Sequence, residues 1–119
     1  MENYSLERQF GTGISVVGSE PFLYTAIKNW LTTPEGVLIS DISSVAVNSS
    51  NLVHVFNRGP NPVAIFKQDG SYVNSWGNDI LADAHGISIN AQGVVYLGDR
   101  DAHQILKCTH DGTLLMALG

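Results

Sequence analysis

An internal repeat constrains this 119-residue chain more than any other feature of its sequence. Residues 43–77 and 85–119 align without a gap at an offset of 42 residues. The two copies share short apolar runs, an arginine in the same loop, an Asp-Gly pair and a closing glycine. The matches are Val45-Ala46-Val47 with Ile87-Ser88-Ile89, Arg58 with Arg100, Asp69-Gly70 with Asp111-Gly112, and Gly77 with Gly119. The two copies are therefore expected to fold alike and to bury their faces against neighbours.

Each repeat has the pattern of four short strands separated by polar turns, which favours all-β architecture. The Asp-Gly pairs are typical of tight hairpin turns, because they tolerate the left-handed backbone conformation. A period of about 40–45 residues with four strands is typical of a β-propeller blade. The sequence therefore predicts an all-β propeller with strands over residues 45–47, 52–56, 63–66 and the run to Trp76, then 87–89, 94–97, 104–107 and the run to Leu118.

The chain is predicted to contain an N-terminal segment, residues 1–21, and a partial β-propeller over residues 22–119, about two and a half blades. Residues 24–30 alternate and end in a tryptophan, like the end of the first repeat. This pattern predicts the outermost strand of an incomplete preceding blade, and a short helix is the alternative. Closed propellers have about 4–8 blades, so the chain is expected either to come from a longer protein or to complete a ring by association.

Composition excludes several classes of partner and location. The net charge of −5, with only six lysines and arginines, argues against nucleic acid as a partner. The sequence predicts no membrane-spanning helix, because its apolar runs are shorter than about 18 residues. The N-terminus lacks the basic start and apolar core of a signal peptide, so the default expectation is the cytoplasm. Cys108, the single cysteine, is expected to be a small core residue.

His85 is the first candidate for chemistry, because it directly precedes the inner strand of the second repeat. In a propeller, residues at that position converge on the central axis at one face. A neutral imidazole there can bind a metal together with equivalent groups from other blades. The equivalent residue of the first repeat is Ser43. The alternative is a structural polar residue at the entrance to the blade.

Arg58 is the second candidate, because its loop opens on the same face as His85. An arginine there can hold a carboxylate or an oxyanion by bidentate hydrogen bonds. The alternative, favoured by the equivalent Arg100, is a salt bridge between blades. Asp99 and Asp101 are expected to pair with Arg100 or to cap its loop. Other side chains expected at the surface or in turns are His54, His103 and His110.

Two segments carry a resemblance to a known family. The sequences Val55-Phe56-Asn57-Arg58-Gly59 and Ala84-His85-Gly86-Ile87-Ser88-Ile89 resemble NHL-repeat propellers. They are more closely similar to the peptidyl-hydroxyglycine amidating lyases and their bacterial relatives. The run from Gly98 to Lys107 also resembles the corresponding strand of that family, and the similarity covers residues 22–119.

The resemblance implies a six-bladed propeller with a catalytic zinc on its axis, held by three histidines from alternate blades, and a structural calcium. It places His85 on the first zinc ligand and Arg58 on the catalytic arginine that engages the substrate hydroxyl or carboxylate. It places the backbone carbonyls of Val45 and Ile87 on the calcium. The implied reaction is a carbon–nitrogen lyase step that converts a peptidyl-α-hydroxyglycine into a peptide amide and glyoxylate, with zinc acidifying the substrate hydroxyl.

Three hypotheses follow for function. The first is an incomplete zinc lyase of that family, which acts on a peptide or small-molecule substrate once the remaining propeller blades are supplied. The second is a non-catalytic NHL-type module that binds protein or another ligand on its channel face. The third is a homo-oligomer in which three copies close a six-bladed ring and bring three His85 side chains to one axis.

Overall fold

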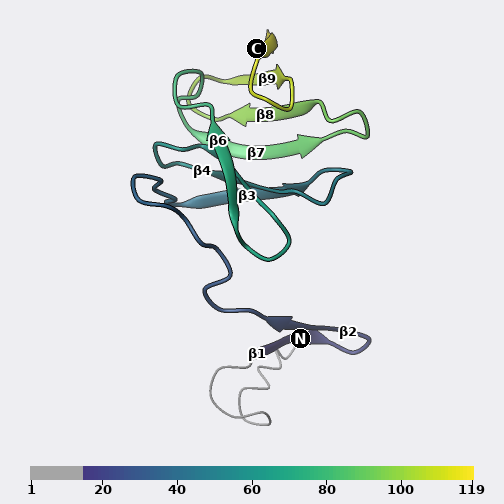
Figure 1. Cartoon of the computed structure of the whole chain (residues 1–119). Helices are drawn as coiled ribbons and strands as arrows, with labels where there is room; N and C mark the ends of the chain where they lie inside the picture. Colours follow the sequence, from purple (N-terminus) through teal and green to yellow (C-terminus); the bar gives the residue numbers. More distant parts are fainter. Residues whose placement is uncertain (1–14) are drawn as a thin grey trace. The chain divides into compact units, whose positions relative to one another are not determined.

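The computed structural model describes residues 15–119, and those residues form strands and turns with no helix among them (Figure 1). The strands make three antiparallel sheets, one of two strands and two of four. The all-β expectation is confirmed, and the alternative of a helix over residues 24–30 is wrong. The strands are β1 Ser15–Ser19, β2 Phe22–Ala26, β3 Ile42–Val47, β4 Val53–Asn57, β5 Val63–Phe66, β6 Tyr72–Trp76, β7 Ala84–Ile89, β8 Val95–Asp99, β9 Gln104–Cys108 and β10 Leu114–Leu118.

The structure divides into two compact units between Trp30 and Leu31. In the first unit, β1 and β2 form a hairpin whose register runs from the pair Ser15 and Ala26 to the pair Ser19 and Phe22. This hairpin crosses the predicted boundary between residues 21 and 22, and the strand expected over 24–30 ends at Ala26 because a turn follows.

The second unit contains the two repeats, and each forms a four-stranded sheet with its strands in chain order. We call β3–β4–β5–β6 the first sheet and β7–β8–β9–β10 the second sheet. The register is equivalent in both, since Val45 pairs with Val55 and Ile87 pairs with Leu97. Gly70 and Gly112 have φ values of +84° and +92°, as the predicted Asp-Gly turns require. The predicted strands of both repeats are confirmed to within a few residues.

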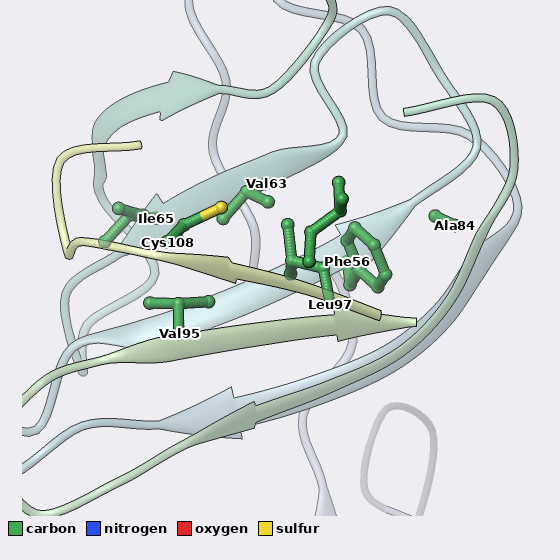
Figure 2. Close-up of a cluster of buried hydrophobic side chains, with 8 residues drawn as sticks. Phe56, Val63, Ile65, Ala84, Val95, Leu97 and Cys108 are labelled. Atoms are coloured by element: carbon green, nitrogen blue, oxygen red, sulfur yellow. The ribbon is translucent and has the colours of Figure 1, made fainter. Parts of the chain in front are cut away.

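The core lies between the two sheets, where β7 lies against β3 and β4 (Figure 1). Alternate side chains of each sheet point into this layer, because successive residues of a strand face opposite sides. The side chains converge from both sheets in Figure 2, and burial of a large apolar side chain contributes about 1.5–3 kcal/mol. The prediction that Cys108 is a core residue is confirmed. The buried cluster is Phe56, Val63, Ile65, Ala84, Val95, Leu97, Leu106 and Cys108.

One histidine lies where the sequence did not place it. His54 is 2% exposed, so the expectation of a solvent-facing or turn residue is wrong. The physical reason is its position two residues before Phe56, which directs both side chains to the same face of β4. Its Nδ1 lies 3.2 Å from the carbonyl oxygen of Leu52, and burial lowers the pKa of its imidazole.

Candidate functional site

His85 lies in a β-bulge at the start of β7. Ala84 pairs with Asp99 and Gly86 pairs with Gly98, so His85 is the extra residue between two consecutive pairs. The first sheet has the same irregularity at Ser43, between Ile42 and Ser44. A bulge changes the direction of the side chain it carries, and bulges are frequent beside functional sites. The sequence places His85 before the strand, but the bulge depends on the pairing register and has no local sequence signal.

The two bulge residues have different surroundings. The Ser43 hydroxyl donates a hydrogen bond to the carbonyl oxygen of Phe56, 3.3 Å away in the neighbouring strand. The His85 side chain is exposed, and within residues 15–119 its imidazole makes no hydrogen bond or ion pair. The ring nitrogens of His85 are therefore accessible to a ligand, whereas the hydroxyl of Ser43 is used to hold its own sheet together.

His85 lines two hollows on the second sheet. One has a volume of about 340 Å³ and is also lined by Arg100, His103 and Gln104, with Ile105 and Leu118 forming its apolar side. The other has a volume of about 380 Å³ and includes Tyr96 among its lining residues. The first hollow combines an imidazole pair and a guanidinium with an apolar surface, which suits a small anion with an apolar portion.

Arg58 takes part in an ion pair that connects the two repeats. Its Nε lies 2.6 Å from Oδ1 of Asp83 and also donates a hydrogen bond to the carbonyl oxygen of Ala84, at 3.2 Å. Nη2 of Arg100 contacts the other oxygen of the same carboxylate. Two arginines at equivalent positions of the repeats thus meet on Asp83, whose side chain is 9% exposed. The alternative stated for Arg58, an inter-repeat salt bridge, is what the structure contains.

Asp83 was not singled out from the sequence. A signal was nevertheless present, because Asp41 precedes the first repeat at the same offset of 42 residues that relates Arg58 to Arg100. Aligning the residues before each repeat as well as those within it pairs the two aspartates. The ion pair itself depends on contact between the two sheets, and local sequence patterns do not report such contacts.

A second pair of equivalent residues holds the loops that carry the arginines. Asn57 Oδ1 accepts hydrogen bonds from the N–H groups of Ser40 and Gly59. Its equivalent Asp99 is 3% exposed and accepts hydrogen bonds from the backbone N–H groups of three loop residues. The donors are Ala82, Asp83 and Ala102.

The hydrogen bonds in this loop also shift the pKa values of Asp99 and Arg100. Burial alone raises the pKa of Asp99, but the hydrogen bonds to its carboxylate outweigh burial and leave the pKa below its ordinary value. Asp101 accepts a hydrogen bond from Nε of Arg100 at 3.0 Å, which raises the pKa of the guanidinium. The expectation that these two aspartates pair with Arg100 or cap its loop is confirmed, since Asp99 caps the loop and Asp101 pairs with Arg100.

Arg58 and His85 are brought together by the fold but do not share a hollow. Arg58 is bonded to the carbonyl of Ala84, the residue before His85, yet it lines a separate hollow of about 220 Å³ with Pro60 and Pro62. His85 lies with Arg100 and His103 on the second sheet instead. The structure thus brings the two predicted residues to the same end of the sheets, where they line separate hollows.

The three histidine ligands that the resemblance implies for zinc are not brought together among residues 15–119. Within residues 15–119, no group of three or more His, Cys, Asp or Glu side chains is placed to hold a metal ion. A three-histidine zinc site therefore does not fit inside these residues of one chain. Val45 and Ile87 lie at equivalent positions of neighbouring strands, and the N–H of Ile87 donates to Ser44 Oγ at 3.4 Å.

No protein-family model matches the chain, and a search of curated proteins finds no significantly similar sequence. The part of the chain that the structure describes also has no helix that is both long and apolar enough to span a membrane.

Proposed function

We propose that the two four-stranded sheets are successive blades of an NHL-type β-propeller. Three observations support this. Each sheet is an antiparallel meander in chain order, the two repeat at 42 residues, and the first strand of the second sheet lies against the first two strands of the first sheet. A full ring of six such blades is the architecture that the resemblance implies.

Within that frame, we propose that His85 supplies one metal ligand of a lyase site that acts on peptidyl-α-hydroxyglycines. The observation that carries the proposal is the accessible imidazole in the bulge of β7, beside a hollow of about 340 Å³. A neutral imidazole is a common zinc ligand, and catalytic zinc needs three protein ligands with one open position. One chain contributes one such ligand, so the remaining two come from other blades.

Arg58 is the proposed contact for the substrate carboxylate. Its ion pair with Asp83 uses Nε, and the side chain remains 38% exposed beside the 220 Å³ hollow. A guanidinium has further N–H donors in the same plane, so it can bind Asp83 and a substrate carboxylate together. The Asp83 contact then acts as a positioning interaction, because it fixes the plane of the guanidinium. When bound, zinc would polarise the substrate hydroxyl.

Zinc binding in samples where the other blades are present tests the role of His85. We expect calorimetry to detect zinc binding there with the native chain and its loss with His85→Ala. The matched control is His110→Ala, because His110 is also exposed but lies in the turn between β9 and β10. Equal zinc binding by the native chain and His85→Ala would overturn the assignment of the ligand.

Glyoxylate release from a synthetic peptidyl-α-hydroxyglycine tests the reaction. We expect release only in samples where the other blades are present, and a loss of that activity in His85→Ala and Arg58→Ala. Zinc binding without glyoxylate release in a completed ring would reject the lyase reaction but keep the metal site.

A second candidate is a non-catalytic module that binds a ligand at the same face. Two observations favour this function. Arg58 is already paired with Asp83, and residues 15–119 contain no group of three side chains placed to hold a metal ion. It predicts that peptides bearing a carboxylate bind near Arg100 and His103 without zinc. Calorimetric titration of such a peptide into the metal-free chain, with Arg100→Gln as the comparison, distinguishes this function from the lyase.

A further inference from the structure

The second sheet has an apolar face directed away from the first sheet. We call it the outer face. Its residues alternate with those of the core along β8 and β9, and it continues onto β10, where Met116 pairs with Lys107 and Leu118 pairs with Ile105. Ile105, Met116 and Leu118 are exposed by 47%, 49% and 66%. The residues of the outer face are Tyr96, Ile105, Lys107, Met116 and Leu118.

The outer face is the repeat equivalent of a face that is already an interface. Phe56, Val63 and Ile65 lie on the corresponding side of the first sheet, where the second sheet covers them. The same pattern of strands thus presents one covered and one exposed copy of the same kind of surface. An exposed apolar face whose repeat equivalent is a covered interface is typical of an association site.

The ion pair between Arg58 and Asp83 also has equivalent residues, Arg100 and Asp41, that do not form the same contact within one chain. Arg58 reaches forward to Asp83, which precedes the next sheet. Its equivalent, Arg100, bonds backward to Asp83 and sideways to Asp101, and its side chain is 57% exposed. Asp41, the equivalent of Asp83, is exposed and forms no ion pair with any residue of the described chain. One acid without an ion pair among the described residues, Asp41, and one largely exposed base, Arg100, therefore remain at opposite ends of the repeat pair.

The first strand of the first sheet completes the match. Val45 and Val47 are each 54% exposed on β3. Their equivalents on β7, Ile87 and Ile89, pack against the core cluster between the sheets. The β3 strand, with the acid that precedes it, thus presents to solvent the same elements with which β7 contacts the first sheet.

We propose that a second copy of this chain docks head to tail on the outer face. Its β3 lies against β7 and β8 of the first copy, and Arg100 of the first copy pairs with Asp41 of the second, as Arg58 pairs with Asp83 within one chain. The interface is heterologous, because each copy uses a different surface, so it propagates to a closed ring or an open chain. The proposal does not depend on the lyase assignment, since neither zinc nor substrate contributes to the contact.

Charge reversal tests the pairing in sedimentation velocity experiments over a range of protein concentrations. We expect the native chain to associate as concentration rises, and Asp41→Arg and Arg100→Asp each to weaken association by at least about tenfold. The double variant Asp41→Arg/Arg100→Asp restores association, because the pair is rebuilt with its charges exchanged. Asp69→Arg, an equal change of charge in the exposed turn after β5, leaves association unchanged.

Mixing the two single variants gives a sharper result. The native Arg100 of Asp41→Arg pairs with the native Asp41 of Arg100→Asp, and the two substituted positions are also opposite in charge, so a one-to-one mixture associates more strongly than either variant alone. Because Arg100→Asp also removes a contact with Asp83, Val45→Lys on the exposed side of β3 provides a second, independent disruption. A native chain that stays monomeric at every concentration, or a double variant that fails to recover, overturns the proposal.

Discussion

Removing the Asp83 carboxylate should loosen the contact between the two repeats. The Nε of Arg58 lies 2.6 Å from Oδ1, and the Asp83 side chain is 9% exposed. A hydrogen bond to a charged group contributes about 1.5–3 kcal/mol, and the partial exposure of Arg58 places this one near the lower limit. Arg100 is more than half exposed, so its bond to the same carboxylate adds little. Asp83→Ala is therefore expected to destabilise the chain by about 1.5 kcal/mol.

Urea unfolding followed by circular dichroism measures this change. At a slope of about 1.5 kcal/mol per molar urea, the midpoint should fall by about 1 M. Asp101→Ala is the matched control, because Asp101 also pairs with Arg100 but is 59% exposed and does not bond to Arg58. If the two variants shift the midpoint equally, the ion pair does not hold the repeats together and the reasoning is refuted.

Three further changes test the core, a turn and a buried histidine. Leu97→Ala, at a fully buried position, should cost about 2–5 kcal/mol in urea unfolding. Gly112→Ala should cost about 1–3 kcal/mol through its φ of +92°, and more than Gly93→Ala, because only at Gly112 does the added carbon meet the Trp76 ring, at 2.7 Å. Burial lowers the pKa of His54, so the unfolded chain binds more protons below about pH 6.5. The contribution of His54 to the unfolding free energy should be constant above that pH and fall below it, and His54→Gln should reduce that fall.

The strands of both repeats were predictable because their signals are local and duplicated. The run Val63–Phe66 matches the observed β5 at both ends, and the Asp-Gly turns fall where Gly70 and Gly112 have positive φ. Each pattern is short, but its recurrence at the same offset makes chance agreement improbable. The prediction of a strand over residues 24–30 was less accurate, since these residues lie outside the two copies that align without a gap.

The candidate site was less predictable because it depends on register and on contact between sheets. The bulge at His85 arises from how β7 pairs with β8, and the contact of Arg58 with Asp83 joins the first repeat to the segment just before the second. The burial of His54 was predictable in principle. Alternation along β4 places it on the same face as Phe56, a residue that the pattern marks as core.

Equivalent positions of the two repeats help to distinguish residues that hold the structure from residues that can bind a ligand. Positions occupied by chemically similar side chains in both copies, such as Asn57 with Asp99, accept backbone hydrogen bonds that hold their loops. The bulge position differs, since Ser43 is bonded within its own sheet and the imidazole of His85 is not bonded within residues 15–119. The hydrogen bond of Ser43 explains the serine of the first copy, whereas no hydrogen bond within residues 15–119 explains the histidine of the second. A ligand present at one copy would account for it, and His85 is therefore the residue to test first for chemistry.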